Sequence, residues 1–202
     1  MPPDDDHDHD EHDHDDHGHA HAAVDDRHEA EVEARRRRAL AQIRQYPDVA
    51  LRLRANEVTE FDEDLRPLAE RMEQLMDDAQ GIGLAATQIG VLRRVFVFRP
   101  AEDTVVAVVN PRIVDPGGGS ETEEEGCLSL QGVRVAVERA TKLTLEGRDL
   151  DGGDLKLELE GMGARVAQHE LDHLDGVLIV DRTDDESRRK ALGILRPKPV
   201  LR

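Results

Sequence analysis

The chain has 202 residues, enough for one domain with its own core, and its apolar fraction of 38% is modest for a globular protein. The net charge of −18 is uneven, because residues 1–31 carry −12 of it, so the acidic balance indicates nothing about the substrate of the folded part. A single cysteine excludes an intramolecular disulfide, and neither a signal-peptide core nor a run of roughly 18 apolar residues is present, so we expect a cytoplasmic protein outside the membrane.

The N-terminal segment is a low-complexity run of aspartate and histidine with almost no large apolar side chains. Because such a run cannot offset the entropy cost of folding, we predict a disordered tail over residues 1–30. The tail holds 8 of the 10 histidines, which either bind Ni²⁺, Zn²⁺ or Fe²⁺ loosely or simply belong to a solubilising acidic segment. A short arginine-rich helix is predicted over 31–45, and the folded domain over 31–185.

Beyond a turn at 46–48, the spacing of apolar residues predicts two helices and five strands. The helices span 63–79 and 163–175, and Gly176 is expected to end the second one. The strands span 91–98, 104–110, 133–138, 141–150 and 154–161. An Asp-Gly-Gly turn at 151–153 predicts a hairpin between the last two strands. Because helices and antiparallel strands are segregated along the chain, we predict an α+β fold.

The second of these helices contains the sequence HELDH at 169–173, which matches the pattern H-E-x-x-H. Residues four positions apart lie one turn above each other, so His169 and His173 can both reach one cation. Glu170 lies beside them and can contact a water on that cation. A catalytic site keeps one position open, so a further protein ligand is needed. The same pattern also arises by chance on charged helices, and it serves metallopeptidases as well.

Cys127 is the candidate for the third ligand, placed in EGCLS at 125–129 between an acidic loop and a strand. As a thiolate it would bind a borderline or soft divalent cation well. Taken alone, however, a single cysteine is more often a small core residue.

Three segments in order, GIGLAATQ at 81–88, EGCLS at 125–129 and QHELDH at 168–173, together resemble the peptide deformylase family. The resemblance extends from residue 46 to residue 182. It implies a hydrolase that removes the N-formyl group from the N-terminal formylmethionine of newly made polypeptides and releases formate. It also implies an α+β fold in which antiparallel strands pack around a central metal-binding helix. In one departure, Gln131 stands where the family usually has a proline.

The resemblance implies a role for each matching side chain around the metal. Cys127, His169 and His173 would hold one divalent cation, with Fe²⁺ expected and Zn²⁺ or Ni²⁺ as possible substitutes. Glu170 would act as general base and then as general acid. Gln88 would donate its side-chain amide to the developing oxyanion.

The backbone N–H of Leu128 would be the second oxyanion donor. For the substrate, we expect an extended peptide to pair with the backbone around Ile82 and Gly83 on one side and Gly126 on the other. An apolar pocket for the methionine side chain would include Ile82 and Val166, although Val166 fits an ordinary core position equally well.

Two arginines near the second motif have an open role. Arg134 and Arg139 would either steady the peptide or the loop, or be solvated charges on a strand. The basic segment at 186–202 is expected to be a tail, and it could rest on ribosomal RNA through phosphate contacts.

The expected partners are a nascent formylmethionyl peptide and the ribosome, with no DNA, no membrane and a monomeric state. Two rival functions remain. A metallopeptidase would use the same helical motif but has no need of Cys127. A metal-buffering protein would rely on the histidine-rich tail but would need neither Glu170 nor Gln88.

Overall fold

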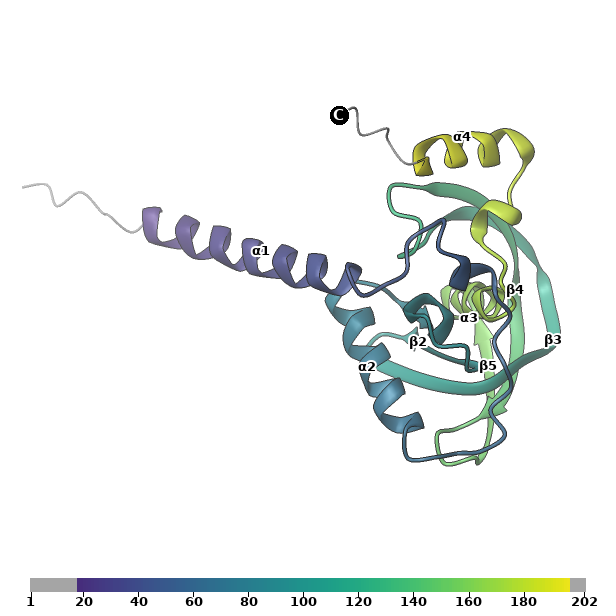
Figure 1. Cartoon of the computed structure of the whole chain (residues 1–202). Coiled ribbons are helices and arrows are strands. Elements are labelled where there is room, and N and C mark those ends of the chain that lie inside the picture. Colours follow the sequence, from purple (N-terminus) through teal and green to yellow (C-terminus); the bar gives the residue numbers. More distant parts are fainter. Residues whose placement is uncertain (1–17, 197–202) are drawn as a thin grey trace, which may run out of the picture. The chain divides into compact units, whose positions relative to one another are not determined.

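The computed structural model describes residues 18–196 of the chain. Contacts divide the chain into two units, residues 1–34 and 35–202. In the first unit, residues 18–34 belong to helix α1 (Gly18–Leu40), drawn in purple in Figure 1. The sheet, the other helices and the candidate site all belong to the second unit.

Helix α1 begins at Gly18 instead of residue 31 and ends at Leu40 instead of residue 45. The stretch from 20 to 34 is rich in alanine and glutamate, which have high helix propensity and outweigh the scattered aspartates and histidines. The predicted disordered tail therefore does not extend to residue 30. Residues 1–17 of that tail lie outside the described residues.

The sheet has five strands in the order of the chain, each antiparallel to the next. They are β1 (Gly83–Ala85), β2 (Val95–Ala101), β3 (Thr104–Gly126), β4 (Arg134–Arg148) and β5 (Asp154–Glu160). The predicted hairpin at 151–153 is confirmed, because Arg148 of β4 pairs with Asp154 of β5. The short strand β1 was missed, since its three residues show no alternation.

Strands β3 and β4 are longer than predicted. The strands expected at 133–138 and 141–150 are one continuous strand, and the strand expected at 104–110 extends to Gly126. The polar residues Glu138, Arg139 and Thr141 interrupt the apolar pattern of β4, but β3 pairs with this stretch as well. The pairing between β3 and β4 therefore makes both strands longer than their apolar residues indicate.

Strand β2 is buried on both faces, which explains its continuous apolar run. Val95 and Val97 pack into a cluster with residues of α2 (Leu65–Asp78), whereas Phe96 and Phe98 pack into a second cluster with residues of α3 (Gly161–Leu174). Because side chains alternate along a strand, one face meets each helix. The two helices therefore lie on opposite faces of this strand.

Helix α3 lies at the centre of the fold and packs against all five strands (Figure 1). The helices predicted at 63–79 and 163–175 are confirmed as α2 and α3, to within about two residues at each end. Gly176 adopts φ +73°, and its N–H bonds to the carbonyl of His173 while Val177 N–H bonds to that of Asp172. This is the glycine-terminated helix end that the sequence predicted. The predicted α+β fold, with antiparallel strands around a central helix, is confirmed.

Helix α4 (Asp185–Leu195) packs against β4 and buries Ala191. Asp184 caps it by accepting hydrogen bonds from the N–H groups of Glu186 and Ser187. The first part of the predicted C-terminal tail is therefore an ordered helix, and residues 197–202 lie outside the described part. Short 3₁₀ helices span Val49–Arg52, Ala86–Ile89 and Ile179–Asp181. Among residues 18–196 no helix has the length and apolarity needed to cross a membrane.

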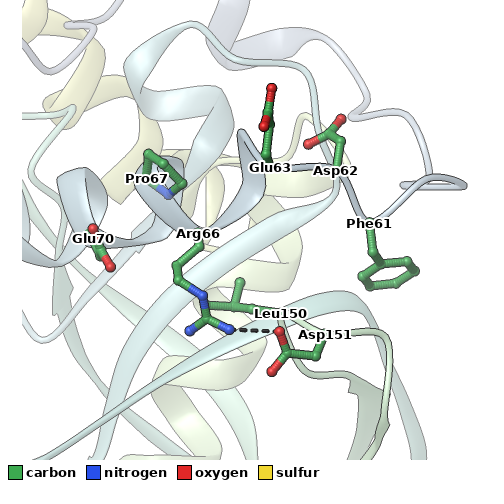
Figure 2. A pocket seen from close by; sticks show the side chains of 8 residues that line it. All are labelled: Phe61, Asp62, Glu63, Arg66, Pro67, Glu70, Leu150 and Asp151. Carbon is green, nitrogen blue, oxygen red and sulfur yellow. Dashed lines mark hydrogen bonds and ion pairs between the residues drawn. The ribbon is translucent and has the colours of Figure 1, made fainter.

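A hollow of about 500 Å³ lies where α2 begins, beside the turn between β4 and β5 (Figure 2). Its walls are mainly charged, and Arg66 and Asp151 pair across it at 2.7 Å. Asp62, on its rim, pairs with Arg93. None of the residues predicted to act in chemistry lines this hollow.

Candidate metal centre and active site

Two segments carry the candidate ligands. Helix α3 carries His169 and His173, and the turn directly after β3 carries Cys127. The sulfur of Cys127 and one ring nitrogen of each histidine lie within 4.8 Å of one another. Cys127 Sγ lies 3.2 Å from His173 Nε2. The structure thus brings together the three residues that the sequence suggested as ligands.

These three residues fit a divalent metal. A thiolate and two imidazoles suit Fe²⁺, Zn²⁺ and Ni²⁺. Nδ1 of His169 lies 2.9 Å from Glu125 Oε2, and because a carboxylate only accepts, that nitrogen carries the proton and leaves Nε2 for a metal. Burial lowers the pKa of His173, which keeps its ring neutral, as ligation requires.

Glu170 is buried beside the candidate ligands. Its side chain is 3% exposed, and its Oε2 has no hydrogen-bond partner among the described residues. Burial raises the pKa of Glu170 to about 7, because an ionised carboxylate is poorly solvated there. A divalent cation nearby would favour the ionised form instead. Without a metal, Glu170 would therefore exchange a proton near neutral pH, and a bound cation would move that range downward.

The segment from β1 to the following 3₁₀ helix passes close to the ligands. A Cβ at Gly83 would lie 2.3 Å from Glu170 Oε1, so only glycine lets the strand approach so closely. Gln88 is held at both ends of its amide. Its Oε1 accepts a hydrogen bond from Ala85 N–H at 2.8 Å, and its Nε2 donates to Ser129 Oγ at 3.0 Å. The same Nε2 is 3.7 Å from Cys127 Sγ, so the amide donor points toward the metal centre.

A cleft of about 650 Å³ opens onto these residues. It contains Cys127, His169, Glu170 and Gln88, together with all the residues predicted to meet the substrate: Ile82, Gly83, Gly126, Leu128 and Val166. Ile82 is 47% exposed at its edge, whereas Val166 is almost fully buried. His173 is not part of the cleft wall, because it lies deeper, 1% exposed.

Arg139 is not the solvated strand charge that was one alternative, and its pairing with Glu125 of the second motif agrees with the other, a side chain that steadies this loop. It is buried, and it pairs with Glu125 through two nitrogens and with Asp172 of α3 at 2.6 Å. It therefore neither reaches a peptide nor faces solvent. The alternation of β4 was a usable signal, because Val135 and Val137 are buried and Arg139 continues their face. Arg134 is exposed and donates to the carbonyl of Glu124.

Glu125 is one of the site residues that sequence reasoning did not single out. It is buried, although it lies next to exposed acidic residues in the second motif. Burial would raise its pKa, but hydrogen bonds from His169 and Arg139 prevail and lower it to about 2. Glu125 is therefore a permanently charged acceptor for the His169 ring.

Comparisons with known proteins agree with this arrangement. The sequence model of the polypeptide deformylase family matches residues 40–189. The peptide deformylase of Desulforudis audaxviator is 44% identical over 152 residues, covering 75% of this chain and 99% of that relative. The crystal structure of a peptide deformylase from Legionella pneumophila superposes with a TM-score of 0.72 at 40% identity, covering 76% of this chain and 91% of the other.

The crystal structure of peptide deformylase from Thermotoga maritima superposes with a TM-score of 0.68 at 44% identity, covering 70% of this chain and 96% of that one. The family match includes all three motifs of the cleft, and it leaves residues 1–39 and 190–202 outside. With a family match over most of its length and relatives aligned almost from end to end, this chain belongs to the polypeptide deformylase family.

Proposed function

We propose that this chain removes the formyl group from the N-terminal methionine of newly made polypeptides at the metal centre formed by Cys127, His169 and His173. Membership of the deformylase family makes deformylation the activity of this chain. The observation that supports this location of the active site is the cluster of three candidate ligand atoms within 4.8 Å of one another. We propose Fe²⁺ as the native metal, with Zn²⁺ or Ni²⁺ able to replace it.

A divalent cation held by these residues would make a water molecule a stronger nucleophile and would polarise the formyl oxygen. Glu170 would accept the proton of the attacking water and return it to the departing amine as the C–N bond breaks. Formate and the free amino group are then the products. The buried Oε2 of Glu170, without a partner in the described part of the chain, supports this role.

The negative charge that develops on the formyl oxygen needs fixed donors. We propose the side-chain amide of Gln88 and the backbone N–H of Leu128 for this purpose. The two hydrogen bonds that hold the Gln88 amide support its part, because a donor fixed before the reaction pays no reorganisation cost.

For the substrate, we propose that an extended peptide lies in the cleft and pairs with the backbone around Ile82, Gly83 and Gly126. The exposed side chain of Ile82 and the buried Val166 both line this cleft, which supports their contact with the methionine side chain. Gln131 also lines it, so the loop that departs from the usual proline borders the substrate.

We further propose a monomeric, cytoplasmic protein with its catalytic domain at 31–185 and a basic C-terminal segment that binds the ribosome. The basic side chains of α4 at 188–190 are exposed and would make this contact, although Arg188 and Lys190 also pair with Asp181 and Glu186. Co-sedimentation with ribosomes should weaken steeply as salt rises, because phosphate contacts release counterions. Association that is absent, or insensitive to salt, would contradict it.

Formate release is the decisive measurement for the proposed function. The chain should be purified without oxygen, loaded with Fe²⁺, and given a formyl-methionyl peptide. We expect one formate for each new amino terminus and no cleavage of internal peptide bonds. A metal-loaded chain that releases no formate would overturn the proposal, and cleavage of internal bonds would favour a metallopeptidase instead.

A further inference from the structure

Arg165 is a buried arginine of α3 whose role neither the motifs nor the cleft chemistry explains. It is 7% exposed, although arginine rarely lies in a protein interior without a partner. Its NH1 donates to Glu125 Oε1 at 2.8 Å and to the carbonyl of Val137 at 3.0 Å. Its NH2 donates to the carbonyl of Glu121 at 2.8 Å, and its Nε pairs with Glu123 at 3.0 Å.

The partners of Arg165 lie on two neighbouring strands. Glu121, Glu123 and Glu125 belong to β3, and Val137 belongs to β4. A guanidinium is a rigid fork with five donors, so these contacts fix the position of β3 relative to α3. Arg165 also lies four residues before His169, one turn away on the same face of α3.

Glu125 connects Arg165 to the metal centre. Its Oε2 accepts from His169 Nδ1 at 2.9 Å and from Arg139, whereas its Oε1 accepts from Arg139 and Arg165. Each oxygen of the Glu125 carboxylate thus accepts two hydrogen bonds. With Arg139 alone, one side of Oε1 would lose its donor, and the carboxylate could rotate away from the imidazole.

We infer that Arg165 is a positioning residue for the metal centre. It acts through Glu125 to hold His169 in the orientation and tautomer that a metal ligand needs. The inference rests on the proposed metal-dependent function. Groups that orient a metal-binding histidine typically alter metal affinity by about 10- to 100-fold when removed. Because Arg165 acts one contact further away, we expect an effect near the lower limit.

A purely structural role for Arg165 makes a different prediction. If it only joined β3 to α3, its loss would lower the melting temperature and leave metal retention unchanged. Removal of Arg165 leaves no buried charge without a partner. Glu125 still pairs with Arg139, and the side chain of Glu123 is already partly exposed to solvent. Arg165→Gln is therefore a suitable variant, since its amide can still donate to one of the strand carbonyls.

The test measures how fast the cobalt-loaded chain releases Co²⁺ to excess chelator, together with the visible spectrum of the bound Co²⁺. For Arg165→Gln we expect release about 10-fold faster than for the wild type and a changed spectrum. For Arg165→Lys, which keeps the charge but not the fork, we expect an intermediate rate. Glu123→Gln, which removes only the outer partner of Arg165, serves as control and should release Co²⁺ within about twofold of the wild type.

The outcomes separate this inference from the proposed function. A wild-type chain that retains no Co²⁺ would contradict the proposed metal centre itself. A wild type that retains it, with a folded Arg165→Gln variant that releases it equally fast, would overturn the role of Arg165. If Arg165→Gln does not fold, Arg165→Lys decides, and a rate within about twofold of the wild type would overturn the inference just as well.

Discussion

Replacing Glu170 by glutamine should lower the rate of formate release by about 10²- to 10⁴-fold and leave the metal in place. The amide has nearly the same size as the carboxyl group, so it fits the narrow space between α3 and the backbone of Gly83. It cannot accept a proton from water, however, and no other carboxylate lines the cleft without a charged partner at its side. The proton shuttle is therefore lost, while the three candidate ligands remain.

The measurement compares kcat for formate release with metal content per chain. Glu160→Gln is a matched control, because Glu160 immediately precedes α3 but pairs with Lys142 outside the cleft. It should change neither quantity. A Glu170→Gln chain that keeps both its metal and more than about a tenth of the wild-type kcat would exclude Glu170 as the proton carrier.

Replacing Gln88 by leucine should lower kcat by about 10²- to 10³-fold with a much smaller change in KM. The lost donor acts on charge that exists only in the transition state, so binding of the ground state is affected less. The fold should also be less stable by about 1–3 kcal/mol, because leucine leaves the buried Ala85 N–H without its acceptor.

Gln88→Glu keeps an acceptor at this position and removes only the donor. Its carboxylate can still accept from Ala85 N–H, but it no longer donates toward the cleft. Because a carboxylate is poorly solvated at this buried position, we expect the melting temperature to stay below that of the wild type and kcat to stay low. Near wild-type formate release by either variant would refute the assignment of Gln88 as an oxyanion donor.

The sequence was sufficient to predict the parts of the site that have a fixed local spacing. His169, Glu170 and His173 share one helical turn, and the helix forms where its apolar pattern indicates. Cys127 was proposed as the third ligand from the chemistry of its thiolate, and the resemblance to a known family supported it, whereas Gln88 came from the motifs of that family alone. The structure places all five next to one cleft or directly beneath it.

The parts that depend on distant contacts could not be predicted in this way. The full lengths of β3 and β4 result from pairing with each other through a polar stretch. Glu125, Arg139 and Arg165 look like surface charges in the sequence, and only the packing of strands around α3 buries them together. For Arg139 the alternation of β4 was a usable clue, but for Arg165 only the fold reveals its partners.

The candidate ligands come from two segments that the folded sheet brings together, Cys127 after β3 and the histidine pair in α3. In an unfolded chain, an ion joining them would first have to close the loop of residues between them, at a cost in chain entropy. An ion held by all three residues therefore acts as a reversible cross-link between sheet and helix. Because such an ion would bind the folded chain far better than the unfolded one, we expect part of the stability of this fold to follow the free metal concentration by mass action.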